Sequence, residues 1–329
     1  MRRLLAMIAI LACLGLGGAG GWRWLRAAYG APGPAAAPVT VVIPKGAHLS
    51  DIAELTAQAG AVDSAWLFMA EAVLAGSPAL QAGEFAFPAH ASMAAMLDAM
   101  HRGLVVEHRL TVPEGLTVRQ VVALIDHAEA LRGGLLKTPT EGALLPQTYF
   151  YVYGDPRDAL LARMTSAMTQ AVDTLWAGRA PDLPLADKSQ ALTMASIVER
   201  ETSLSSERPH VAAVYENRLR LRMKLESDPT VIYAASQGEG VLDRPISRAD
   251  LALASPYNTY QNDGLPPGPI CNPGRASIEA VLHPMASDDL YFVADGSGGH
   301  AFAKTLAQHN KNVEKWRQIE KSQGAAKGG

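Results

Sequence analysis

The sequence predicts an α+β protein with an N-terminal transmembrane helix, a small module after it and a larger mixed α+β domain. Three observations support this architecture. An uncharged apolar run opens the chain at residues 4–21 and is just long enough to cross a bilayer as a helix. A strand–turn–helix pattern then occurs twice, at residues 39–55 and 108–124. A regular helical segment at residues 187–202 dominates the larger domain.

Composition excludes several classes of protein. The chain has 329 residues, enough for two domains, and a formal net charge of -3 with 19% charged residues. It therefore has no global basic field, and nucleic-acid binding is not expected. Cys13 and Cys271 lie far apart and predict neither a metal site nor a disulfide. The 9 histidines lack paired-ligand spacing, so a metallohydrolase is not expected either.

The apolar run at residues 4–21 predicts a retained membrane anchor over residues 1–21. Aromatic and basic residues typical of a membrane interface follow it: Trp22, Arg23, Trp24 and Arg26. The very short N-terminal flank favours export of the large C-terminal part. A cleaved signal peptide, cut near residues 18–21, is the main alternative, and a lipoprotein cysteine at Cys13 is a weaker one. Residues 22–38, rich in Pro, Gly and Ala, predict a linker.

Residues 39–107 are predicted to form the small module. It opens with a β-rich run, a Pro-x-Gly turn and an amphipathic helix, and the same pattern begins the next domain at residue 108. The two copies align at their turn residues: Pro44 and Gly46 with Pro113 and Gly115. A helical run near residues 65–74 and the segment 83–88 lie between the copies.

The larger domain is predicted to span residues 108–320, followed by a flexible low-complexity tail at 321–329. Residues 144–153 alternate like a strand or the lip of a cleft, and residues 155–177 carry a long helical pattern. A further helix is expected at residues 209–221. The basic residues near its end suit either a solvated edge or the wall of a cleft for an anionic polymer: Arg218, Arg220, Arg222 and Lys224.

The segment 187–202, DKSQALTMASIVERET, predicts a helix of about four turns, because Ala, Leu and Met fill it without Gly or Pro. On a period of 3.6 residues, Glu201 shares an apolar face with Met194, Ile197 and Val198. Burial on such a face raises the pKa of a carboxyl group and keeps it protonated, as a general acid requires. The alternative is a structural Glu at a helix end, bonded to an Arg or a backbone amide.

Glu199 projects about 160° away from Glu201 around the predicted helix. The two carboxyl groups are therefore not expected to form an adjacent pair. Four segments after this helix are predicted to be loops that shape a site, since they combine Pro, Gly, Asn and Thr with aromatic or histidine side chains. They are residues 227–234, 256–260, 264–274 and 298–305.

Several motifs together resemble those of the endolytic murein transglycosylase family, the YceG-like membrane-anchored lytic transglycosylases. In chain order they are ASIVERET, NRL, SDPTVIY, YNTY, GLPPGPI, NPG and YFVADGSGGHAF. The resemblance runs from the N-terminal run to about residue 315. The turn at Gly46 and the L-x-x-I-A that follows it also resemble a LysM module, a fold that grips N-acetylglucosamine polymers. Whether this LysM-like module binds glycan or only packs is left open.

The family resemblance implies cleavage of the β-1,4 bond between N-acetylmuramic acid and N-acetylglucosamine inside a peptidoglycan strand. Glu201 would act as the acid and, once ionised, would take the proton of the muramic C6 hydroxyl, which closes onto C1 as a 1,6-anhydro ring. Glu199 would be a supporting structural carboxylate. The other candidate substrate-binding residues of the cleft are Asp228, Thr230, Tyr257, Asn258, Tyr260 and His300.

The resemblance also implies a single-pass protein of the bacterial inner membrane whose catalytic domain lies in the periplasm. Nascent glycan strands would be its substrate, peptidoglycan synthases its partners, and no metal or organic cofactor is implied. Two alternatives remain. One is a muramidase that uses water, with Asp228 or Glu226 as base or nucleophile. The other is a non-catalytic scaffold that binds glycan and recruits the growth machinery.

Overall fold

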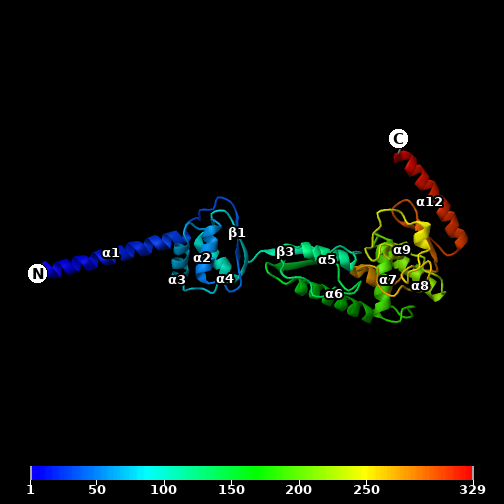
Figure 1. Cartoon of the computed structure of the whole chain (residues 1–329), viewed down its shortest axis with the longest axis horizontal. Coiled ribbons are helices and arrows are strands. Elements are labelled where there is room, and N and C mark those ends of the chain that lie inside the picture. Colours follow the sequence, from blue (N-terminus) through cyan, green and yellow to red (C-terminus); the bar gives the residue numbers. More distant parts are fainter. Residues whose placement is uncertain (1, 328–329) are drawn as a thin grey trace. The chain divides into compact units, whose positions relative to one another are not determined.

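A computed structural model gives the fold of the chain and describes the backbone of residues 2–327. In the two terminal helices, the side chains of residues 2–6, 8–15 and 323–327 lie outside the description. The chain forms two compact units (Figure 1). The first comprises residues 1–108 and 150–155, and the second residues 109–149 and 156–329. Helices and strands occur in both units, which confirms the predicted α+β class.

The first unit is built around an antiparallel pair of strands. Its elements are α1 (Arg2–Gly30), β1 (Val39–Ile43), α2 (Leu49–Gln58), α3 (Ala65–Leu74), β2 (Gly83–Phe87) and α4 (Met93–Arg102). β1 pairs with β2 so that Val41 lies opposite Phe85. Alternate side chains of both strands are buried, since successive residues of a strand point to opposite faces. They join Phe68 of α3 and Leu97 of α4 in one hydrophobic core.

The predicted membrane anchor, residues 4–21, falls within α1. Most of its side chains, those of residues 4–6 and 8–15, are outside the description. Among the residues that are described, no helix is long and apolar enough to cross a membrane. The anchor stays a prediction from the sequence.

The segment predicted as a linker, residues 22–38, is held by the first unit. Its first part continues α1 as far as Gly30, and Tyr29 packs against the core. Further on, the backbone N–H of Gly33 donates to the carbonyl of His90 at 3.2 Å, and the N–H of His90 donates to the carbonyl of Ala35 at 2.7 Å. These bonds hold residues 33–35 against the first unit, and the assignment of residues 22–38 as a linker stays a prediction.

The remaining elements follow from residue 107 onward. They are β3 (Glu107–Thr111), α5 (Val118–His127), β4 (Thr148–Val152), α6 (Arg157–Ala177), α7 (Lys188–Glu201), α8 (Arg208–Arg220), α9 (Asp228–Ala235), α10 (Arg248–Leu251), α11 (Arg275–Leu282), β5 (Tyr291–Ala294), β6 (His300–Ala303) and α12 (Leu306–Lys327). β3 pairs with β4, and β5 forms an antiparallel hairpin with β6.

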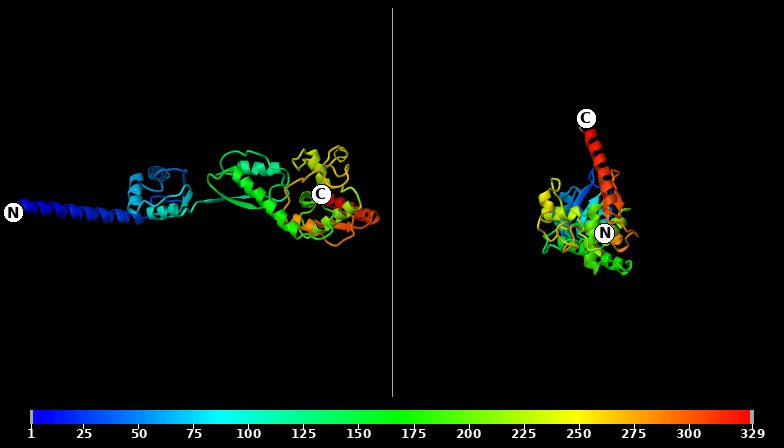
Figure 2. Two further views of the ribbon diagram at one scale, coloured as in Figure 1. Left: turned by 90° about the horizontal axis from the view of Figure 1, so that it is seen from below. Right: turned by 90° about the vertical axis from the view of Figure 1, so that its right-hand side faces the viewer.

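Helix α7 lies at the centre of the second unit, with α6, α8, α9 and α11 packed against it (Figures 1 and 2). Met194, Ile197 and Val198 of α7 are completely buried and meet Val211 of α8 and Ile278 of α11 in the core. The predicted apolar face of this helix is therefore confirmed. Burial of this face fixes the position of α7, and therefore also the position of Glu201 at the end of the helix.

The repeated strand–turn–helix pattern appears in the structure as β1 with α2 and as β3 with α5. Gly46 and Gly115 occupy the corresponding turns with φ of 83° and 79°. Only glycine adopts this left-handed region without strain, which explains why the two copies share it.

Three segments differ from the expectations. Residues 227–234, predicted to be a loop, form most of helix α9, because Pro229 lies in its first turn, where the missing N–H costs nothing. The predicted loop at residues 298–305 contains strand β6, since its residues pair with β5. Residues 321–327, predicted as part of a flexible tail, continue α12, and no proline interrupts them.

Candidate active site

Glu201 is the last residue of α7. The helix begins at an N-cap, Asp187, whose carboxylate accepts the backbone N–H of Gln190 at 2.8 Å. Thr202 follows as the C-cap, and its extended backbone terminates the helix after Glu201. Because the face that carries Glu201 is buried along the rest of the helix, the partly buried carboxyl group of Glu201 emerges at the edge of the core.

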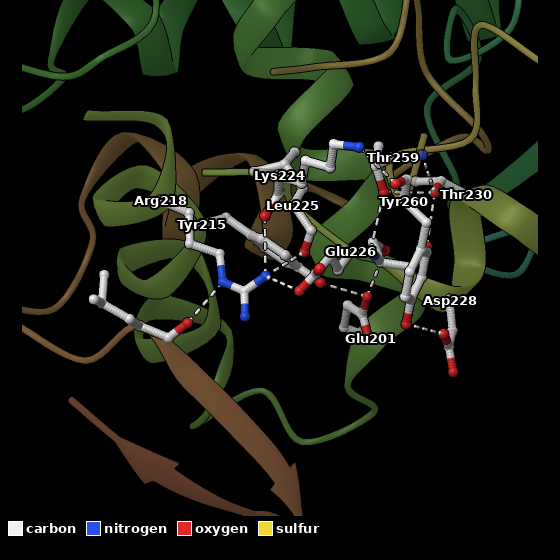
Figure 3. A network of polar contacts seen from close by, with 12 residues as sticks. Glu201, Tyr215, Arg218, Lys224, Leu225, Glu226, Asp228, Thr230, Thr259 and Tyr260 are labelled. Atoms are coloured by element: carbon white, nitrogen blue, oxygen red, sulfur yellow. Dashed lines mark hydrogen bonds and ion pairs between the residues drawn. The ribbon is translucent and has the colours of Figure 1, made fainter. Parts of the chain in front are cut away.

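Two hydroxyl groups converge on a single oxygen of Glu201 (Figure 3). The phenol of Tyr215, from α8, and the hydroxyl of Ser227, just before α9, each donate to Oε1 at 2.5 Å. Within the part of the chain that the structure describes, no residue donates to Oε2. One carboxyl oxygen is thus fully engaged by the protein, and the other is left for a ligand.

The surroundings of Glu201 raise the pKa of its carboxyl group above the ordinary value. Burial is the main cause, because it disfavours the charged form, and the nearby carboxylate of Asp228 adds to it. The hydrogen bonds from Ser227 and Tyr215, and the nearby imidazole of His300, act in the opposite direction without cancelling the effect. Burial also raises the pKa of Tyr215 far above its usual value, so this phenol remains a donor.

Glu201 lines a pocket of about 280 Å³ in the second unit. The β5–β6 hairpin and α12 supply much of the rest of its wall. The residues that line it are Glu201, Thr202, Ser203, Ala294, Gly296, Gly298, Gly299, His300 and Trp316. Among these residues, Glu201 and His300 are the ones whose side chains carry an acid–base group.

His300 is held in this pocket by Glu207, from the turn before α8. Glu207 accepts the backbone N–H of His300 at 2.9 Å on one oxygen and bonds Nδ1 of the ring at 2.8 Å with the other. The hydroxyl of Thr202 donates to the same carboxylate at 3.2 Å. Although burial acts to raise the pKa of Glu207, the bonds from His300 outweigh it and the pKa is lowered. Glu207 is therefore an anionic partner for the ring.

Two further predicted site residues lie next to Glu201. The phenol of Tyr260 donates to Oδ1 of Asp228 at 2.6 Å (Figure 3). Asp228 is exposed at the start of α9 and close enough to influence the pKa of Glu201. The structure thus brings Glu201, Asp228, Tyr260 and His300 together around one region.

The side chains of the other predicted cleft residues bond to or pack against the protein itself. Thr230 is completely buried, and its hydroxyl donates to the carbonyl of Ser227 at 2.7 Å. Asn258 is also completely buried, and its amide donates to three backbone carbonyls. Tyr257 packs on Tyr233 with ring centroids 4.9 Å apart. None of these predicted residues belongs to the pocket of Glu201, and the first two have no exposed surface with which to contact a ligand.

Glu199 bonds an arginine and a backbone amide, which are the contacts expected of a supporting carboxylate. Its carboxylate accepts from Arg208 at 2.9 Å and from the backbone N–H of Gly274, the N-cap of α11, at 2.8 Å. Its side chain is only 4% exposed, and it does not line the pocket of Glu201. Glu226, the other carboxylate considered as a base, pairs with Arg218 at 3.1 Å and is half-exposed.

Sequence reasoning missed Tyr215, Ser227, Glu207 and Trp316 as site residues. Tyr215 belongs to α8, and its ring is buried in the core. Nothing in the sequence marks its hydroxyl as a partner of a residue 14 positions away. Ser227 opens a segment that was singled out, but the hydroxyl received no role.

Across the residues that the structure describes, no group of three or more His, Cys, Asp or Glu side chains is placed to hold a metal ion.

Comparisons with known proteins agree on one family. The model of the YceG-like family matches residues 41–315. A Bacillus subtilis protein named endolytic murein transglycosylase is 32% identical over 311 residues, which covers 84% of this chain and 84% of that protein. A Streptococcus pneumoniae protein of the same name is 29% identical, and the match covers 84% of this chain and 58% of that longer protein.

Among solved structures, the crystal structure of a YceG-like protein from Listeria monocytogenes is similar to this chain. The two are 29% identical and have a TM-score of 0.51. The match covers 83% of this chain and 98% of the Listeria chain.

Proposed function

The chain belongs to the YceG-like family, and on this basis we propose that it is an endolytic murein transglycosylase, a peptidoglycan lyase. It cuts the β-1,4 bond between N-acetylmuramic acid and N-acetylglucosamine inside nascent glycan strands and leaves 1,6-anhydro-muramic acid ends. The observation that carries the proposal is the carboxyl group of Glu201, which lines a pocket and has two hydroxyl donors on one oxygen.

Glu201 is suited to act as the general acid. Because Oε1 already accepts two hydrogen bonds, the proton of the neutral carboxyl group resides on Oε2. The raised pKa keeps that proton in place at a higher pH than in an exposed glutamate. Oε2 donates it to the bridging oxygen as the bond from that oxygen to C1 of muramic acid breaks.

The proposed reaction consumes no water, since the C6 hydroxyl of muramic acid closes onto C1. It therefore needs no second carboxylate to activate water, and Glu199 is engaged with Arg208 and α11 instead. The muramidase alternative would need Asp228 or Glu226 as its base or nucleophile. Asp228 is close enough to Glu201 to influence its pKa, and Glu226 pairs with Arg218, so the product has to be analysed to distinguish the two reactions.

Digestion of uncrosslinked glycan strands in water enriched in ¹⁸O separates the two reactions. Ring closure leaves new muramic ends that carry no ¹⁸O and are lighter by one water than hydrolysed ends. Mass spectrometry of the fragments measures both properties at once. Reducing ends labelled with ¹⁸O would instead establish a hydrolase.

Tyr215→Phe is expected to move the alkaline limb of the pH–rate profile to higher pH. Glu201 is active when protonated, and its protonated fraction falls as pH rises through its pKa. The Tyr215 hydrogen bond favours the ionised form, so its loss raises this pKa further. The measurement is kcat/KM across pH. Tyr233→Phe is the matched control, since that phenol contacts Glu141 and should leave the limb unchanged.

The remaining assignments are proposals from the sequence and the family. Residues 1–21 anchor the chain in the inner membrane, and the part from residue 39 onward lies in the periplasm. This is supported by the apolar run and by the aromatic and basic residues that follow it. The module at residues 39–107 is LysM-like, and residues 108–320 form the catalytic domain. Peptidoglycan synthases make the nascent strands and are the proposed partners of this protein, which limits the length of those strands by cleaving them.

A further inference from the structure

The ring of His300 is oriented by Glu207 and by an aromatic neighbour, Phe292. The carboxylate of Glu207 accepts the backbone N–H of His300 and also engages Nδ1 at 2.8 Å. A carboxylate can only accept, so Nδ1 carries a proton. In the neutral ring, the other nitrogen, Nε2, is then an acceptor with a lone pair.

Nothing in the described part of the chain hydrogen-bonds Nε2. The ring meets Phe292 edge-on at a centroid distance of 5.2 Å, which restricts its rotation. The charged groups that face His300 are Glu207, from the turn before α8, and Glu201, from α7. Helix α12 contributes the uncharged Trp316 to the pocket wall. A proton acceptor and the proposed acid thus line the same pocket.

We propose that Nε2 of His300 is the base that takes the proton from the C6 hydroxyl of muramic acid, and that Glu207 positions the ring for this transfer. This inference rests on the proposed function and replaces Glu201 in the second of its two predicted roles. The arrangement is similar in principle to a carboxylate that fixes the tautomer of a catalytic histidine.

Each bond and each proton is accounted for in the proposed step. The bond between C1 and the bridging oxygen breaks, and that oxygen leaves with the proton from Oε2 of Glu201. The C6 oxygen forms the new bond to C1, and its proton passes to Nε2 of His300. Glu201 is left ionised and His300 protonated, and exchange with solvent restores both groups for the next cleavage.

Two separate groups allow both proton transfers to occur in one step. Because Oε1 is engaged by Tyr215 and Ser227, Glu201 acting alone would have to give up the proton of Oε2 before that oxygen could accept another, and the ring would close only after the glycosidic bond had broken. With Glu201 as acid and His300 as base, the C6 oxygen becomes more nucleophilic while positive charge is developing at C1. The discrete cation at C1 is then avoided.

His300→Asn is the decisive variant, because the asparagine amide can still donate to Glu207 in the manner of Nδ1 but has no equivalent of Nε2. We expect kcat to fall about 10²-fold or more while KM changes less than about threefold. His210→Asn is the matched control, since His210 also bonds a carboxylate, Asp289, at 2.8 Å but does not line the pocket.

Formation of anhydro ends by His300→Asn at the wild-type rate would overturn the inference and return the base to Glu201. If circular dichroism shows that this variant is unfolded, Glu207→Gln takes its place. That variant keeps the ring but removes the anionic partner that orients it, so kcat should fall while KM changes less than about threefold, and an unchanged kcat would contradict the inference. If the wild-type protein forms no anhydro ends at all, the proposed function itself fails, and the base assignment with it.

Discussion

Glu201→Gln abolishes strand cleavage, with an expected fall in kcat of about 10³-fold or more. Glutamine has the same shape as glutamate, and its amide oxygen can still accept from Tyr215 and Ser227. What it lacks is the acidic proton on Oε2. The rate of formation of new strand ends is measured by chromatography, and circular dichroism shows whether the fold is retained.

Glu199→Gln is the control for this substitution, since it makes the same chemical change on the same helix. It alters the bonds to Arg208 and Gly274 and leaves the acid in place, so cleavage should persist. Cleavage by Glu201→Gln at the wild-type rate would mean that the acid lies elsewhere. If neither the wild-type protein nor Glu201→Gln cuts strands that a control enzyme digests, the scaffold alternative becomes the better account.

Arg208→Ala is expected to lower the free energy of unfolding of the second unit by about 3 kcal/mol. The guanidinium group is nearly buried and binds the carboxylates of Glu199, at 2.9 Å, and Glu114, at 3.1 Å. Without it, the charge of Glu199 remains in the interior with no ionic partner, which is far more costly than the loss of an exposed pair. Urea unfolding measured by circular dichroism gives the change, and hydrogen-exchange mass spectrometry reports it for α7.

Lys188→Ala is the matched control, because Lys188 forms an ion pair of similar length, 2.7 Å, with Asp173 at the surface. The side chains of Lys188 and Asp173 are both about half-exposed. Ion pairs between such exposed side chains contribute roughly 1 kcal/mol or less to stability. Equal losses for the two variants would contradict the view that the Arg208 cluster is a buried structural centre.

Short-range patterns in the sequence predicted α7 and its buried face correctly. A helical period needs only the neighbouring turns, and the run of Ala, Leu and Met up to Glu201 supplied it. The same geometry placed Glu199 and Glu201 on different sides, where the structure gives them different partners. Helix α9 was missed, because proline was interpreted as a loop signal when it also suits the first turn of a helix.

The environment of the carboxyl group could not be predicted in this way, because it depends on contacts between distant residues. Ser227 lies 26 positions from Glu201, and His300 lies 93 positions from Glu207. No periodicity relates such residues. Burial separated the candidates as well: Asn258 and His300 both come from segments with site-like composition, yet Asn258 is buried and bonds nearby carbonyls whereas His300 lines the pocket.

The central claim is that strands are cut internally, through Glu201, by closure of the muramic ring. Its most direct test is mass spectrometry of uncrosslinked strands of known length early in digestion, with wild-type protein beside Glu201→Gln. We predict fragments of many lengths with 1,6-anhydro-muramic acid at the new ends, and none of them with the variant. New reducing ends, disaccharides released only from a strand terminus, or the same fragments from Glu201→Gln would each contradict the claim.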